Sequence, residues 1–142
     1  MKKILIGIFI LSSASLFAQD NKDNRVPDNV KNSFQKEYPN AQKPLWDNTN
    51  GKWHATYKDQ DSRNADSYYN TDGRRIETHT AYKQGDLPSK VQENANKQYH
   101  SKYNTSRIDR PNSQPLYEIK LQSGSTTYMD ANGRKRKYED GH

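Results

Sequence analysis

The 142-residue sequence contains no cysteine. No disulfide therefore holds the fold, no cysteine carries a lipid, and none acts as a nucleophile. Aliphatic residues are also scarce. Beyond residue 18 the chain has only ten Leu, Ile and Val residues. Together with Phe34 they are eleven, far below the share of about 20% under which a chain is expected to be disordered. A core made mainly of aliphatic side chains is therefore not available.

Aromatic residues supply the core material that the aliphatic residues do not. Ten tyrosines, two tryptophans and Phe34 lie beyond residue 18. Each of these side chains buries about 150–250 Å² when it is packed, so together they outweigh the aliphatic set. We expect one small folded domain of modest stability, with tyrosine hydroxyls reaching its surface.

The first 18 residues have the pattern of an export signal. Lys2 and Lys3 form a basic start, residues 4–11 form an apolar run, and Ala18 precedes the expected cleavage point. The run is much shorter than the roughly 20 residues of a membrane span. Cleavage removes two lysines and leaves residues 19–142 as the mature domain, with a net charge of +4 instead of +6. We expect a periplasmic or secreted protein without a transmembrane segment.

The mature chain carries one pattern twice, in residues 26–82 and again in residues 87–138. The matching pairs are Pro27 and Pro88, Tyr38 and Tyr99, and Gly73 and Gly133, which lie 61, 61 and 60 residues apart. Self-similarity at a period of about 60 residues is typical of tandem structural units.

Each unit opens with a helix. Pro27 suits a first helical turn, because its missing N–H has no partner to lose there, and Pro39 ends the helix. Apolar residues recur along one face of both helices. These stripes are Val30, Phe34 and Tyr38 in the first unit, and Leu87, Val91, Ala95 and Tyr99 in the second. Such stripes predict core packing.

Short strands follow each helix. Alternating residues and turn signals predict strands at 45–46, 53–57, 68–69 and 74–82, and then at 106–109, 117–121, 126–129 and 134–138. Residues 59–65 are predicted to form a polar loop. The fold class is therefore α+β: two tandem repeats, each a helix followed by an antiparallel meander of about four strands, with the helices packed on one sheet face.

These features together resemble a family of small exported proteins described as PepSY-like or β-lactamase-inhibitor-like. The features are the export signal, the Val/Leu-Pro-x-x-Val helix starts, Tyr38-Pro39, the Trp46 strand, and the Tyr-Asn-Thr-Asp-Gly and Met-Asp-Ala-Asn-Gly turns. The resemblance covers residues 26–137, and it departs at His100, where a proline is expected. The family is similar in architecture to β-lactamase inhibitory protein, whose repeats present a concave sheet to an enzyme. The resemblance implies a binding or inhibitory role.

No pattern of catalytic or metal-binding residues is present. The four histidines lack metal-ligand spacing, and the chain has no nucleophile elbow and no glycine-rich phosphate loop after a strand. Residues 70–73 and 130–133 look like the start of a calcium loop, but basic residues follow each glycine, which favours tight hairpin turns instead. We expect no enzyme activity, no metal and no cofactor.

The Tyr68-Tyr69 doublet is the main candidate for contact with a partner. Neighbouring strand residues point to opposite faces, so only one of these tyrosines lies under the helices. The other joins His54 and Lys58 on the helix-free face, and the sequence does not decide which one it is. We therefore take Tyr68, Tyr69, His54 and Lys58 as candidate contacts of a monomeric protein with a protein or peptide partner, such as an envelope enzyme that it inhibits.

A run of basic residues offers an alternative site in the last predicted strand: Arg134, Lys135, Arg136 and Lys137. Such a run either protects a sheet edge from aggregation or binds an anionic envelope polymer or lipid head group. Nucleic acid is not an expected partner, because acidic residues such as Glu139 and Asp140 are spread among the basic ones.

Overall fold

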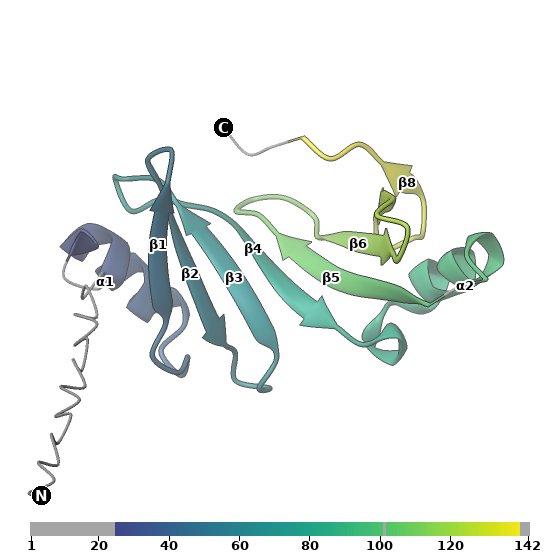
Figure 1. Cartoon of the computed structure of the whole chain (residues 1–142), viewed down its shortest axis with the longest axis horizontal. Helices are drawn as coiled ribbons and strands as arrows, with labels where there is room; N and C mark the ends of the chain where they lie inside the picture. Colours follow the sequence, from purple (N-terminus) through teal and green to yellow (C-terminus); the bar gives the residue numbers. More distant parts are fainter. Residues whose placement is uncertain (1–24, 101, 140–142) are drawn as a thin grey trace, which may run out of the picture.

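The computed structural model describes residues 25–100 and 102–139, so the predicted export signal lies outside the described residues. One antiparallel sheet of eight strands, in the sequential order β1 to β8, forms the body of this part (Figure 1). The elements in chain order are α1 (Asp28–Glu37), β1 (Leu45–Thr49), β2 (Lys52–Lys58), β3 (Asn64–Tyr69), β4 (Arg75–Tyr82), the 3-10 turn η2 (Gln84–Asp86), α2 (Ser89–Gln98), β5 (Tyr103–Asp109), β6 (Leu116–Leu121), β7 (Thr126–Met129) and β8 (Lys135–Arg136). The fold is α+β.

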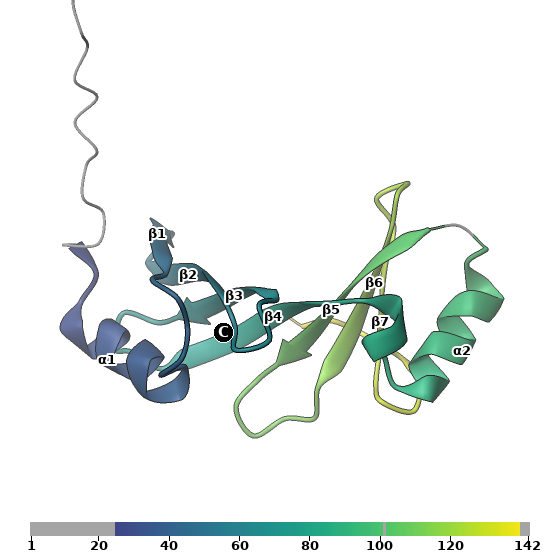
Figure 2. The same ribbon diagram turned by 90° about the horizontal axis from the view of Figure 1, so that it is seen from below.

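Both helices lie on the same face of the sheet. Figure 2 shows α1 against the first four strands and α2 against the later ones. Cross-strand pairs give the same result, because paired residues share a face. Ser67 of β3 pairs with Thr78 of β4, which pairs with Asp109 of β5. The face carrying Ser67 belongs to the core under α1, and the face carrying Asp109 continues to the core under α2. The opposite face is free of helices.

An aromatic cluster joins α1 to the first half of the sheet. Phe34, which is 3% exposed, lies with its ring centroid 4.8 Å from that of Tyr57 and 5.4 Å from that of Trp46. Val30 and Tyr69 are fully buried in the same cluster. Tyr38, which was predicted in the helix stripe, is half-buried and packs against it. Aromatic side chains therefore replace the missing aliphatic core, as the composition predicts.

A second cluster under α2 is more aliphatic. The buried residues of this cluster are Leu87, Val91, Ala95, Tyr103, Tyr117, Ile119 and Met129. Tyr99 is half-buried beside them, and its hydroxyl lies 2.7 Å from Thr127 Oγ1. The helix ends at Gln98 although His100 stands where a proline was expected. Both predicted stripes therefore face the core.

Several predicted strand boundaries were wrong. β1 continues to Thr49 and β5 begins at Tyr103, each three residues outside the predicted bounds. The polar segment 59–65 was predicted as a loop, but β3 begins at Asn64, because Ala65 and Ser67 alternate into the core although their side chains are small. The last strand was predicted over residues 134–138, but only Lys135–Arg136 pairs with β7. Arg134 instead belongs to the preceding turn, where its side chain contacts Asp130.

Neither helix in the described part of the chain is long and apolar enough to cross a membrane.

Candidate binding surface on the helix-free sheet face

A row of cross-strand neighbours crosses the helix-free face from β1 to β4. Asp47 of β1 pairs with His54 of β2, His54 pairs with Tyr68 of β3, and Tyr68 pairs with Glu77 of β4. Strand alternation places these four side chains on one face. Asp66 of β3 and His79 of β4 pair with each other and lie two residues from Tyr68 and Glu77, so they share the same face. The helix-free face is therefore rich in ionisable and aromatic side chains.

The His54 imidazole is the centre of the first group of side chains. His54 Nδ1 lies 3.1 Å from Asp47 Oδ2, and Nε2 lies 2.9 Å from Asp66 Oδ1. The ring stacks on Tyr68 with centroids 4.6 Å apart and planes 3° from parallel. The hydrogen bond to Asp66 is the largest cause of a raised His54 pKa; burial opposes it, and Asp47 adds to it. The same bond is the largest cause of a lowered Asp66 pKa. This geometry favours a charged imidazolium that donates from both ring nitrogens.

We expect stability to depend on pH through His54. A raised pKa stabilises the folded protein fully below the ordinary value of 6.5, and this contribution is lost as the pH rises through the higher folded pKa. An NMR titration should place the His54 midpoint above 6.5, and the melting temperature should fall as the pH rises through that midpoint. The change Asp66→Asn should lower the midpoint, whereas Asp61→Asn, at an exposed aspartate of the β2–β3 loop, should leave it unchanged. A midpoint at or below the ordinary value would contradict the geometry.

A second group of side chains surrounds Glu77, which is 6% exposed. Its carboxylate lies 2.7 Å from His79 Nε2, accepts a hydrogen bond from Arg110 Nε at 2.9 Å, and accepts another from the Tyr138 hydroxyl. Burial alone would raise the Glu77 pKa, but the bonds from His79, Tyr138 and Arg110 outweigh burial and lower it to about 2. The two groups meet where Tyr68 contacts His79 edge-on, with centroids 5.5 Å apart. The two groups therefore form a continuous band, which we call the polar–aromatic band.

The structure separates the two tyrosines of the predicted site. Tyr68 lies on the helix-free face against His54, as one member of the doublet was expected to do. Tyr69 is 0% exposed in the core under α1. Its inclusion among the contact residues was therefore wrong, because no partner reaches a side chain that the helix covers. Lys58 is exposed on the helix-free face, paired with Asn64 at the ends of β2 and β3, so it lies at the margin of the band.

The basic run lies at the edge of the sheet, where β8 is the last strand. Arg134 Nε and Arg136 Nη2 donate to Asp130 Oδ2 at 2.9 and 2.7 Å. Partial burial of Asp130 raises its pKa, but these arginines and the backbone N–H groups of the turn hold it down at about 2. Two of the four predicted cations are thus paired within the fold, although all four side chains are exposed. This arrangement matches a protected sheet edge better than a polyanion site.

Several residues of the polar–aromatic band were not predicted from the sequence. Glu77 and His79 are two positions apart in the predicted strand 74–82, so the sequence alone could have predicted that they share a face. Arg110 lies in the irregular β5–β6 connection, and Tyr138 follows the short β8. No periodic signal links these two residues to Glu77, which lies 33 and 61 positions away.

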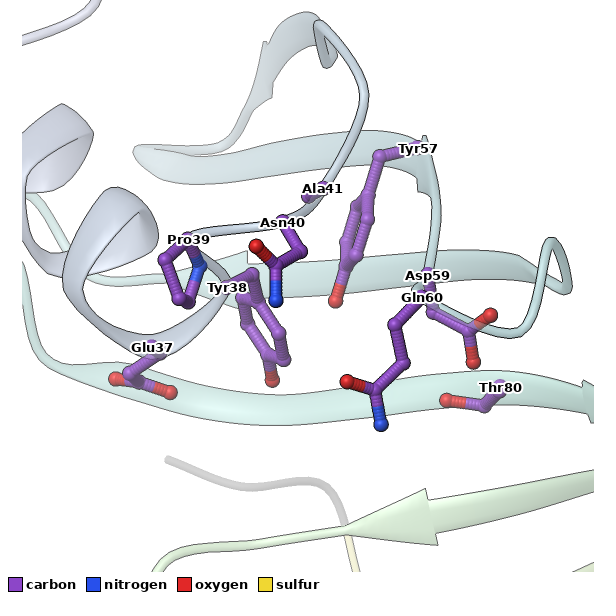
Figure 3. A pocket seen from close by; sticks show the side chains of 9 residues that line it. All are labelled: Glu37, Tyr38, Pro39, Asn40, Ala41, Tyr57, Asp59, Gln60 and Thr80. Atoms are coloured by element: carbon purple, nitrogen blue, oxygen red, sulfur yellow. The ribbon is translucent and has the colours of Figure 1, made fainter.

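A separate hollow of about 330 Å³ lies on the helix side, beyond the end of α1 (Figure 3). Three of its polar side chains already have partners within the fold. The Tyr38 hydroxyl lies 2.6 Å from Thr78 Oγ1, and the Tyr57 hydroxyl lies 3.0 Å from Ser67 Oγ. The Asp59 carboxylate accepts two backbone N–H groups of its own turn.

Neither a protein-family model nor a curated protein matches the sequence. Solved structures do share the fold. A DUF2874 family protein from Bacteroides ovatus superposes with a TM-score of 0.69 at 21% identity, over 78% of this chain and 84% of its own. A candidate periplasmic protein from Bacteroides eggerthii superposes with a TM-score of 0.70 at 17% identity, over 79% of this chain and 86% of its own.

A BLIP-like protein from Bacteroides fragilis superposes with a TM-score of 0.69 at 16% identity, over 80% of this chain and 85% of its own. At these identities the comparisons establish the fold. The described part of the chain has a BLIP-like α+β fold.

Proposed function

We propose that this is an exported, non-catalytic binding protein of the PepSY-like kind, which recognises a protein or peptide partner through the polar–aromatic band. The observation that carries the proposal is the stacked His54–Tyr68 pair, held by Asp47 and Asp66 in the middle of a sheet face that no helix covers. We further propose that the partner is an envelope enzyme or peptidase that the protein inhibits or modulates.

The chemistry of the band suits recognition of a folded surface. Tyrosine is enriched where proteins meet, since its ring gives contact area and its hydroxyl a hydrogen bond. The Tyr68 ring is fixed between His54 and His79, so little side-chain entropy is lost when a partner covers it. The BLIP-like fold of the Bacteroides fragilis protein supports the same type of function.

A catalytic role for His54 is disfavoured by the same geometry. Thr56 Oγ1 lies 3.4 Å from His54 Nε2, and Asp47 lies at Nδ1, an order that resembles a hydroxyl–imidazole–carboxylate triad. However, Asp66 lies closer to Nε2, at 2.9 Å, and Thr56 donates its proton to Asp66. A general base needs a free Nε2 lone pair, whereas these bonds favour an imidazolium that has none.

Two further parts of the proposal concern the chain as a whole. Residues 1–18 act as an export signal, and the mature protein is periplasmic or secreted. Residues 26–82 and 87–138 form tandem repeats. In support, Tyr38 and Tyr99 each cap the end of a helix and hydrogen-bond a threonine of the sheet.

The test is capture from envelope extract by the immobilised mature chain at 0.1 M and 1 M salt, concentrations at which the Debye length is about 10 Å and 3 Å. Binding through the band should persist at the higher salt and in the variant with Arg134, Lys135, Arg136 and Lys137 all changed to glutamine. The change Tyr68→Ala should weaken binding by about thirtyfold, the effect of losing a buried anchor. The matched change Tyr99→Ala, on the helix side, should leave it intact.

A different pattern of binding would contradict recognition through the band. Binding that disappears at 1 M salt or in the glutamine variant, and that survives Tyr68→Ala, would assign recognition to the basic edge and contact with an anionic polymer.

A further inference from the structure

Tyr138, two residues beyond the end of β8, lies in a binding site made by other parts of the chain. Its hydroxyl donates to Glu77 of β4, and the Arg110 guanidinium lies over its ring at 4.7 Å from the centroid. The Tyr138 ring stacks on the Tyr128 ring, with centroids 4.7 Å apart and planes 20° from parallel. His79 meets the Tyr138 ring edge-on at 6.5 Å. We call Glu77, His79, Arg110 and Tyr128 the cradle.

The contacts of the cradle suit a phenol. A buried carboxylate requires hydrogen-bond donors, and a phenolic hydroxyl is a donor at the end of a flat ring. The Arg110 cation and the Tyr128 ring both prefer a flat aromatic partner. A phenylalanine ring would satisfy the two ring contacts but would leave one bond to Glu77 unmade. The cradle therefore distinguishes tyrosine from phenylalanine by a bond to a charged acceptor.

Tyr138 is held by little besides this cradle. It follows β8, which contributes only two residues to the sheet, and residues 137–139 form neither helix nor strand. Arg110 Nη2 is buried and has no hydrogen-bond partner within residues 25–100 and 102–139. The cradle thus retains a buried donor that Tyr138 does not satisfy, which a different occupant with an additional acceptor could pair.

The position of the cradle connects it to the proposed binding surface. His79 contacts both Tyr138 and Tyr68, so the cradle begins where the His54–Tyr68 pair ends. A partner that covers Tyr68 therefore meets Tyr138 next.

We infer that the cradle is a tyrosine-binding site for the partner, and that the chain's own Tyr138 fills it until a tyrosine side chain of the partner replaces it. The inference rests on the proposed function, because the partner is the one that binds the polar–aromatic band. In this arrangement Tyr138 is an internal competitor, and only a partner that presents a tyrosine at this place gains the cradle.

The cradle can be tested without the partner. The probe is N-acetyl-tyrosinamide, added to the full mature chain carrying Tyr138→Ala, with the His79 ring resonances as the reporter. We expect saturable shifts in the variant and none in the wild-type protein at the same concentrations. N-acetyl-phenylalaninamide should bind the variant at least about tenfold more weakly, because it lacks the donor for Glu77. The change Tyr99→Ala, which leaves the cradle filled, should behave as the wild type does.

A second variant keeps the test valid if Tyr138→Ala reduces folding. Tyr138→Phe retains the ring contacts and removes only the hydroxyl, so N-acetyl-tyrosinamide should still shift the His79 resonances where it leaves the wild type unchanged. Equal binding of both probes, or of neither, would overturn the tyrosine site. Capture of a partner without probe binding would refute the cradle alone, and probe binding without capture would refute the proposed function alone.

Discussion

Replacing Phe34 by alanine should cost about 3–5 kcal/mol of folding free energy, the usual range for removing a buried phenylalanine. The side chain is 3% exposed and contacts four other aromatic rings, those of Tyr38, Trp46, Tyr57 and Tyr69. A rigid aromatic cluster does not collapse into the space left behind, so the cavity adds to the lost burial. Urea unfolding of the mature chain, followed by tryptophan fluorescence, measures this loss directly through Trp46 and Trp53.

Leu45→Ala is the control for the Phe34 experiment. Leu45 is also a large apolar residue in the first half of the chain, but it is 74% exposed. Its truncation should change the free energy of unfolding by no more than about 0.5 kcal/mol. A similar small effect for Phe34→Ala would mean that the helix stripe does not form the core.

The architecture could be predicted because it depends on patterns of short range. Helix positions followed from apolar spacing and from Pro27 and Pro39, and hairpin turns followed from the Asp-Gly and Asn-Gly dipeptides. The start of β3 was missed because Asn64 and Asp66 are polar on the helix-free side and Ala65 is small. Before Tyr68, neither side of that strand carries the hydrophobic signal that marks a strand in a sequence.

Only part of the candidate site could be predicted. His54 and Lys58 alternate with buried residues, which placed them on the helix-free face. Whether Tyr68 or Tyr69 joins them depends on the register of β3 against β2, and a shift by one residue exchanges the two faces. The register comes from tertiary packing, which buries Tyr69 beneath α1.

The cradle of Tyr138 was beyond the reach of sequence patterns for a different reason. Its members come from β4, the β5–β6 connection and β7, and its occupant Tyr138 comes from the segment after β8. Contacts between such distant segments depend on the curvature and twist of the whole sheet, which no local period encodes. Conversely, the basic run at 134–137 was the most visible charge feature of the sequence, yet half of its charge is paired with Asp130.

Replacing Gly133 by alanine should destabilise the second half of the protein by more than about 3 kcal/mol. Gly133 has a φ of +75°, which costs a residue with a side chain about 1–3 kcal/mol. In addition, a Cβ at this position would lie 2.5 Å from the carbonyl oxygen of Lys90 and 2.6 Å from Asn94 Nδ2, both in α2. Because Asn94 Nδ2 donates to the Gly133 carbonyl at 3.0 Å, the turn and the helix cannot separate without losing that bond. Thermal and urea unfolding measure the effect.

Gly124→Ala separates the two causes, because Gly124 also has a positive φ, +92°, but nothing lies within 4 Å of its added Cβ. We expect this control to cost about 1–2 kcal/mol, the backbone strain alone. The turn of the first half should repeat the contrast: Gly73, whose Cβ would meet the Asn29 carbonyl at 2.8 Å, against Gly51, whose surroundings are open. Equal losses at Gly133 and Gly124 would mean that contact between the closing turn and its helix contributes nothing. A larger loss at both Gly73 and Gly133 would show that each half is held by the same junction of turn and helix.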